Sequence, residues 1–444
     1  MAWRICLVAL FGALLSQLDA TIVNVSLSNL AADLGSTLST IQWVTSGYLL
    51  ALTLVLPLNG WLVDRIGAKA MYLYCFSAFT LSSALCGLAW SAGSLIGFRV
   101  LQGIAGGLLA PMMQMMVARA AGKQMARVIG YLSAPVFLAP TFGPLLAGVI
   151  LEYASWRWLF LLNLPVGAVA LVLAAFFLPN DEQDAKRREL DWIGLALLSP
   201  GLVLFLYGSE RLGQSAGVGA LAGGIVMIAA FVLMSRRKGD RALIDLRLFK
   251  GKVFSASAMT QFLSNGSLFA GQMLIPIFLI QACGRSPSEM GWMLTPLGLG
   301  MITTYVSMGT LTKRFGIRRV SVGGACLAVI ATLPFFYLTS HGLDLAILMP
   351  SLFFRGLGQS AVGIPAISAA YASVSRQDLP MATTSLNIVQ RLGGPTFTTL
   401  CATILGSQLA SYDSGRGAYV GAFLLLCALH LLTLVAAFRL PRRI

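Results

Sequence analysis

Long apolar stretches separated by short polar joints recur along the whole of this 444-residue chain. A helix needs about 20 apolar residues, at a rise of about 1.5 Å each, to cross the hydrocarbon of a bilayer. Stretches of that length lie near residues 5–28, 40–63, 70–90, 94–118, 128–151, 156–178, 191–209, 217–234, 253–281, 290–312, 319–339, 345–372, 380–408 and 418–438. The pattern predicts an all-α, polytopic membrane protein with fourteen transmembrane helices.

Two of the polar joints are copies of each other. Residues 60–69 read GWLVDRIGAK and residues 309–318 read GTLTKRFGIR, so two glycines and an arginine recur at the same spacing. Two further pairs repeat roughly 250 residues apart, namely Phe98-Arg99 as Phe354-Arg355 and Gly143-Pro144 as Gly394-Pro395. Many secondary transporters are built from internal repeats, with the substrate site between the halves. The chain is therefore predicted to consist of two related halves.

The interval between the copies is longer than six helices require. The additional residues contain two apolar stretches without charged side chains in their interior, at 191–209 and 217–234, and charged linkers flank them. We therefore predict a six-helix bundle at 1–178, an inserted helix pair at 179–252 and a second six-helix bundle at 253–444. The inserted pair carries no buried charge, which favours a role as a lipid-facing strut or spacer.

Composition and charge agree with the membrane class. Hydrophobic residues make up 57% of the chain and charged residues only 11%, and the formal net charge is +15. Most of the 31 lysines and arginines lie in alternate joints. Cation-rich joints stay in the cytoplasm, so both termini are predicted to be cytoplasmic. Topology and anionic lipid headgroups explain the positive charge, and no nucleic-acid partner is expected.

Asp19 is the one acidic residue, among 16, that falls well inside a predicted span. Ionisable groups at such depth are costly and usually mark functional sites. By helical rise, Asp19 on the first helix and Arg99 on the fourth lie about 21 Å and about 22 Å from the inner face. We predict that they pair, with Gln102 one turn along the face of Arg99, and that Asp19 carries a proton while Arg99 tunes it. A purely structural ion pair is the alternative.

Further polar residues share helix faces in the second half of the chain. Gln261, Asn265 and Gln272 form one stripe, and two arginines each have an amide four residues away. With Gln102, the predicted substrate cavity is lined by Gln261, Asn265, Gln272, Arg355, Gln359, Asn387 and Arg391. The arginines have no carboxylate partner in this half, so they contact either backbone carbonyls or an anionic group of a substrate.

Enzymatic functions are disfavoured by what the chain lacks. It has no Gly-x4-Gly-Lys-Ser/Thr phosphate loop, so ATP-driven pumping is not expected. Its two histidines, His341 and His430, cannot build a usual metal site with the acids available, and no Ser-His-Asp arrangement is evident. We predict no enzymatic activity, no cofactor and no metal.

Several segments carry transporter motifs. Residues 18–25 read LDATIVNV, residues 99–103 read RVLQG, residues 140–148 read PTFGPLLAG and residues 156–165 read WRWLFLLNLP. Together with the joint at 60–69, they resemble the major facilitator superfamily, and within it the fourteen-helix drug:proton antiporter branch of the EmrB/QacA type. The resemblance covers nearly the whole chain. It implies the major-facilitator fold, in which two pseudo-symmetric six-helix bundles here carry two inserted helices between them.

The resemblance also implies roles for particular positions. It implies an inner gating motif in Gly60, Asp64, Arg65, Gly67 and Lys69. It implies an antiporter motif in Pro140, Gly143, Pro144 and Gly148, in which Ala147 replaces a usual glycine. The aspartate of the first-helix motif, here Asp19, is implicated in proton coupling. Some relatives carry a second acid in helix 13, where this chain has Arg391.

The resulting expectation is a proton-coupled exporter of drugs or toxic compounds that works by alternating access in the bacterial cytoplasmic membrane. The expected partners are a small-molecule substrate, protons and the lipid bilayer, with a periplasmic adaptor protein if it works as EmrB-type relatives do. Two alternatives stay open. One is an exporter of a specific metabolite or organic anion, and the other is a non-transporting membrane scaffold or sensor.

Overall fold

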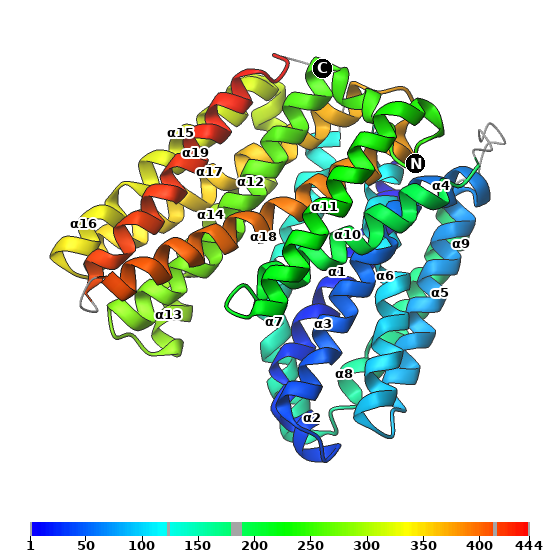
Figure 1. The fold of residues 1–444 in the computed structure, drawn as a ribbon, viewed down its shortest axis with the longest axis horizontal. Coiled ribbons are helices and arrows are strands. Elements are labelled where there is room, and N and C mark those ends of the chain that lie inside the picture. Colours follow the sequence, from blue (N-terminus) through cyan, green and yellow to red (C-terminus); the bar gives the residue numbers. More distant parts are fainter. Residues whose placement is uncertain (1, 122–124, 179–188, 412–414, 443–444) are drawn as a thin grey trace.

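The structure is a computed structural model that describes residues 2–121, 125–178, 189–411 and 415–442. Every regular element in these ranges is a helix (Figure 1), which confirms the predicted all-α class. A helix pairs its backbone groups within one segment, as hydrocarbon requires. The first nine helices are α1 Ala2–Val25, α2 Leu27–Asp33, α3 Leu38–Val55, α4 Asn59–Ile66, α5 Ala68–Gly87, α6 Ala92–Ala121, α7 Met125–Tyr153, α8 Trp158–Leu161 and α9 Asn163–Phe177, with the short turn η1 Leu56–Leu58 before α4.

The remaining helices follow the same design of long rods joined by short turns. They are α10 Trp192–Glu210, α11 Ser215–Lys238, α12 Lys252–Ile277, α13 Pro287–Met293, α14 Thr295–Phe315, α15 Ile317–Thr332, α16 Pro334–His341, α17 Leu345–Ala372, α18 Leu379–Ser411 and α19 Val420–Phe438. In the described ranges, ten helical spans are long and apolar enough to cross a membrane, or eleven if the bent pair α1–α2 counts as one. The other predicted stretches coincide with α7, α14 and α18, so fourteen spans stay a prediction.

The helices form two groups that meet along a seam. Helices α1 to α9 form one bundle and α12 to α19 the other, and the bundles diverge away from the end that carries both chain termini (Figure 1). The repeated joints adopt the same conformation in both bundles: Gly67 between α4 and α5 has φ +93°, and Gly316 between α14 and α15 has φ +80°. Only glycine adopts this conformation readily, which explains why the repeat retains it.

The inserted pair α10–α11 lies across the seam. A cluster of apolar side chains joins Leu198 and Leu202 of α10 to Leu56 of the first bundle and to Met381 and Ile388 of the second. The pair therefore contacts both bundles, while α11 itself is largely exposed, and the predicted role as a lipid-facing strut or spacer stays a prediction. The predicted boundaries at residues 178 and 252 stay predictions.

An aromatic stack and a hydrogen bond also attach the C-terminal end of α10 to the two bundles. The Tyr207 ring stacks on Trp43 of α3 with centroids 6.3 Å apart, and the Thr399 hydroxyl of α18 donates to the Ser209 carbonyl at 3.1 Å. At the start of α10, Asp191 accepts a 2.6 Å hydrogen bond from Lys238 of α11. Burial opposes the charge of Asp191, but this bond and those from the Gly194 and Leu243 amides outweigh it, so the pKa of Asp191 lies below its usual range. The insert is therefore a bridge fixed at both ends.

Candidate functional site

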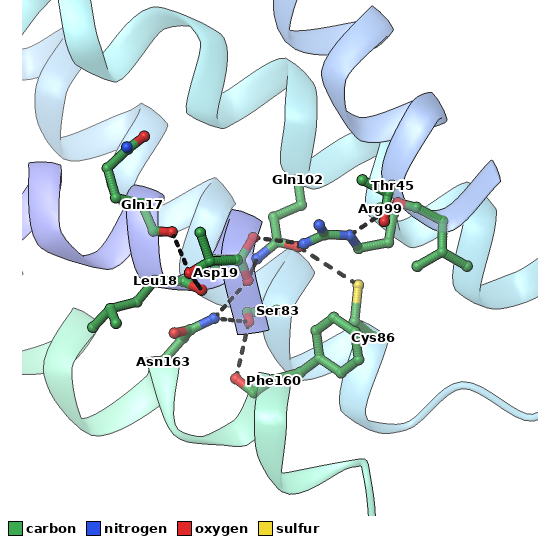
Figure 2. Close-up of polar contacts among 12 residues, drawn as sticks. Gln17, Leu18, Asp19, Thr45, Ser83, Cys86, Arg99, Gln102, Phe160 and Asn163 are labelled. Atoms are coloured by element: carbon green, nitrogen blue, oxygen red, sulfur yellow. Dashed lines mark hydrogen bonds and ion pairs between the residues drawn. The ribbon is translucent and has the colours of Figure 1, made fainter. Parts of the chain in front are cut away.

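The predicted contact between Asp19 and Arg99 is present, inside the first bundle (Figure 2). Arg99 Nη1 donates to Asp19 Oδ2 at 2.6 Å, and both side chains are fully buried. Their shared depth follows from the antiparallel course of α1 and α6, as the helical rise predicted. The functional role of the pair stays a prediction.

Two amides complete the shell around the Asp19 carboxylate. Asn163 Nδ2 at the start of α9 donates to Oδ1 at 2.9 Å, and Gln102 Nε2 donates to the same oxygen at 3.2 Å. Asn163 also donates to the Ser83 hydroxyl, which itself donates to the Phe160 carbonyl at 2.9 Å. Four helices of one bundle thus supply donors or supports around one carboxylate (Figure 2).

Arg99 is held on three sides. Its Nε donates to the Val44 carbonyl at 3.2 Å, its Nη1 also donates to Gln102 Oε1 at 2.7 Å, and its guanidinium carbon lies 4.2 Å from the centre of the Tyr48 ring. A planar guanidinium can donate several hydrogen bonds in its plane while its face packs on an aromatic ring, and Arg99 does both. The Tyr48 ring therefore covers one face of the Arg99 guanidinium.

Close approach of α7 to α1 supports the position of Asp19. A Cβ added at Gly143 would overlap the side chain of Thr21, two residues after Asp19. Gly143 of the predicted antiporter motif thus has a steric reason to be glycine. Gly148 is exposed and a Cβ there would meet no other atom within 4 Å, and the side chains of Pro140 and Pro144 lie outside the described residues.

Replacing Arg99 by lysine is expected to reduce proton-driven transport at least about tenfold although the charge is kept. A lysine ammonium cannot reach Asp19, Gln102 and Val44 together while lying flat on Tyr48, and each charged hydrogen bond lost is worth about 1.5–3 kcal/mol. The measurement is transport by purified protein in proteoliposomes, with the melting temperature as a folding control. Wild-type rates in a folded R99K variant would contradict the assigned geometry.

The two bundles touch at the end of the molecule that carries the termini. Gln114 of α6 accepts hydrogen bonds from Tyr371 at 2.8 Å and from Asn387 at 2.9 Å, both in the second bundle. Asn59 of α4 donates to Thr384 of α18 at 3.2 Å. We call these contacts, with the crossing of α7 and α14 described next, the seal.

Glycines bring the backbones together within the seal. A Cβ added at Gly130 of α7 would overlap the Tyr305 carbonyl of α14, and a Cβ added at Gly309 would overlap the side chain of Arg127. At Gly60 the nearest atom would be Thr384 Oγ1 of α18, 3.3 Å away. Shape complementarity between the bundles is thus built on small residues, as in other membrane helix contacts.

The predicted gating motif lies beside the seal. Gly60 contacts α18, Gly67 makes the turn into α5, and Arg65 is exposed with its guanidinium 5.4 Å from the Trp61 ring. Asp64 is partly buried and Lys69 follows in the first turn of α5. The motif therefore joins α4, which contacts α18 of the other bundle, to α5, which packs on helices of its own bundle.

Several of the predicted cavity residues are occupied by contacts within the protein. Gln359 donates to the Ser264 carbonyl at 2.7 Å, and Gln261 donates to the Gly363 carbonyl and accepts from Gln390 at 2.8 Å. Gln102 belongs to the Asp19 shell and Asn387 to the seal. These four side chains hold helices together in this state.

Arg355 occupies a second-bundle position like that of Arg99, without a carboxylate. It is buried and donates to Thr332 Oγ1 at 3.3 Å and to the Ser267 carbonyl at 3.4 Å. A Cβ added at Gly271 of α12 would overlap its Nη2, so the arginine packs against a glycine there. In the described residues the second bundle therefore has the arginine of the repeat without an acid paired to it.

Three of the predicted cavity residues keep unused polar groups. Asn265, Gln272 and Arg391 are partly or fully exposed and make no hydrogen bond or ion pair within the described residues. Asn265 and Gln272 share a face of α12 with Leu268, which packs against a cluster containing Ala126 of the first bundle. That face of α12 is therefore directed toward the seam.

Sequence reasoning missed several residues of this site. Asn163 and Tyr48 flank the ion pair, and Gln114 and Tyr371 form the centre of the seal, yet none was among the predicted site residues. Asn163 and Gln114 are polar residues within apolar stretches, and this feature of the sequence could have identified them as site residues. Tyr48 and Tyr371 carried no signal of their own, because aromatic residues are common in such helices.

The architecture is that of a membrane transport protein: two related helical bundles around a seam, one of them with a buried ion pair. The chain belongs to the Major Facilitator Superfamily, whose family model matches residues 9–254 and 257–443. It is a multi-pass membrane protein, and the family consists of transporters rather than enzymes.

Curated relatives agree with this family. The chain is 34% identical over 412 residues to a protein of Mycobacterium tuberculosis named Multidrug resistance protein B homolog, covering 90% of this chain and 76% of that one. It is 31% identical over 430 residues to MdtD of Escherichia coli, which is also named for multidrug resistance, covering 93% and 88%.

Solved structures show the same fold. The human organic anion transporter MFSD10 aligns with a TM-score of 0.66 at 18% identity, covering 99% of both chains. The proton:xylose symporter XylE aligns with a TM-score of 0.68 at 14% identity, covering 98% of this chain and 94% of that one. At such identities the likeness concerns the fold alone.

Proposed function

We propose that this chain is a proton-driven exporter of small molecules, a multidrug or toxic-compound antiporter that works by alternating access. The observation that carries the proposal is the fully buried Asp19–Arg99 pair in one of the two bundles of a Major Facilitator protein. Relatives at 34% and 31% identity that are named for multidrug resistance support the direction and breadth of transport.

The site suits reversible proton binding. Burial disfavours an isolated carboxylate, while Arg99, Asn163 and Gln102 stabilise it, so small rearrangements of these donors change which form is favoured. A proton on Asp19 removes the charge that holds Arg99. Coupling then follows by linkage, because a proton and a substrate that favour opposite states of the seam drive each other across the membrane.

The proposed location is the bacterial cytoplasmic membrane with both termini in the cytoplasm. The cation-rich joints support this orientation. In it the seal lies on the cytoplasmic side, so the described conformation faces outward, ready to release substrate and accept a proton. An adaptor protein on the outer side is part of the proposal only by analogy with EmrB-type exporters, since no contact surface for it is assigned.

The test is transport by purified protein reconstituted in proteoliposomes. The pH on the external face is made lower by about two units. We expect a diverse panel of aromatic compounds to include substrates that then move against their gradient, and we expect protons to move in the opposite direction. A membrane scaffold or sensor would show no substrate-dependent proton flux. Collapse of the pH gradient with nigericin is the control, and unchanged substrate movement after collapse would refute proton drive.

A further inference from the structure

The charges within the spans do not balance. Among the described residues, Arg99, Arg355 and Arg391 lie well inside spans, where Asp19 is the one acid, so two positive charges remain without a carboxylate. Arg355 is enclosed by its own bundle, whereas Arg391 is partly exposed. An unpaired guanidinium in a low-dielectric region is strongly unfavourable, and such residues usually line substrate pathways.

Arg391 lies at the seam just beyond the seal. It follows Asn387 by one helical turn, and Asn387 contacts Gln114 of the first bundle. It is also within electrostatic range of Tyr48, whose ring stacks on Arg99. Arg391 therefore lies on α18 one turn beyond the contact with α6, the helix that carries Arg99.

Neutral hydrogen-bond donors lie on the neighbouring helix. α12 packs along α18, and its Asn265 and Gln272 amides face the seam with no partner within the described residues. A guanidinium binds carboxylate, sulfonate or phosphate oxygens, and unpartnered amides along the same side of the seam can donate to other acceptors of the same molecule.

The geometry points to Arg391 as the binding point for an anionic group of the exported molecule, so that the substrates are organic anions. This inference rests on the proposed function and specifies its substrate class. Arg391 makes the charged contact, and Asn265 and Gln272 supply neutral donors.

Binding at Arg391 also accounts for coupling to the proton. The titratable or charged groups facing Asp19 in the described residues are Arg99, Tyr48 and Cys86. When Asp19 is protonated, Arg99 loses its counter-ion and its charge repels that of Arg391 next to the seal, which favours opening toward the cytoplasm. An anion on Arg391 removes this repulsion and favours the sealed, outward-facing state. Proton and anion thus act on the seal in opposite directions, as antiport requires.

The charge balance of this cycle is measurable. One proton moving inward and one monovalent anion moving outward transfer two positive charges toward the cytoplasm, whereas exchange for a monovalent cation transfers none. For the anion, a potential of about 60 mV changes the steady-state gradient about a hundredfold, and for the cation it changes nothing.

The experiment uses the purified full chain in proteoliposomes with independent control of pH and of potential, the latter through potassium and valinomycin. The probes are anilinonaphthalene sulfonate as a monovalent aromatic anion and ethidium as a monovalent aromatic cation. The variants are R391Q and R391K. The matched control is R285Q, which removes a guanidinium from an exposed position outside the spans.

We expect the wild type to transport the sulfonate, faster with the cytoplasmic face negative. R391Q should raise its KM about tenfold or more and R391K by less, with R285Q unchanged. Proton-driven transport of ethidium alone, or sulfonate transport with the same KM in R391Q, would overturn the inference while leaving the proposed function intact. Failure of a pH gradient to drive these probes and every compound of the diverse panel would contradict the proposed function itself. Melting temperatures separate loss of binding from loss of folding.

Discussion

Replacing Asp19 by asparagine is expected to abolish transport driven by a pH gradient. Asparagine keeps the size of the residue, but its amide nitrogen cannot accept a hydrogen bond as the replaced carboxylate oxygen does, and it cannot gain or lose the proton. Driven transport should fall to the background rate, at least about a hundredfold, because no other acidic residue lies well inside a span. Substrate exchange without a gradient should still be measurable, because the residues that form the seal are all present.

The control for this prediction concerns stability. Removing one partner of a buried ion pair costs about 3–5 kcal/mol, because Arg99 would be left buried without a counter-ion. The double variant Asp19→Asn with Arg99→Gln restores a neutral network and should recover most of that stability without recovering coupling. Full gradient-driven transport by either variant in proteoliposomes would remove Asp19 from the mechanism.

Replacing Gly130 by valine is expected to trap the protein with its seal open. The added side chain would overlap the Tyr305 carbonyl on the other bundle, and a backbone atom cannot move aside as a flexible side chain can. Overpacking of this kind costs about 1–3 kcal/mol, which shifts the equilibrium away from the sealed state by about 5- to 150-fold. Transport should fall by a similar factor, because the outward-facing state is required in each cycle.

Hydrogen exchange distinguishes this result from misfolding. In G130V, amides of α7 and α14 around the crossing should exchange faster, while those in the α3–α6 contact should keep their protection. The matched control is Gly323→Val in α15, where an added Cβ meets nothing within 4 Å. Wild-type transport and protection in G130V would mean that the α7–α14 contact is not part of the cycle.

Part of the site was predictable because it depends only on how deep each residue lies in the membrane. The helical rise from each end of a span places Asp19 and Arg99 at one level, and the repeat at Gly67 and Gly316 reappears as two turns of positive φ. Such features need only the position of a residue along its own helix.

Other features depend on which helix faces meet, and here the prediction was incomplete. Gln359 and Gln261 looked like cavity residues from their spacing, but they are used within the second bundle. Gln114 gained its importance from Tyr371 and Asn387, which lie more than 250 residues later in the chain. The inserted pair bridges the bundles because apolar side chains from three parts of the chain meet at Leu198.

The sequence by itself determined the helices, the duplication and the single deep acid of this protein, because membrane insertion acts on each segment according to its own composition. Only the tertiary structure decided which donors surround that acid, where the bundles seal and which arginine is left facing the seam. Those outcomes arise from packing of side chains between helices, where small residues and hydrogen-bond partners select one arrangement among many with the same apolar pattern.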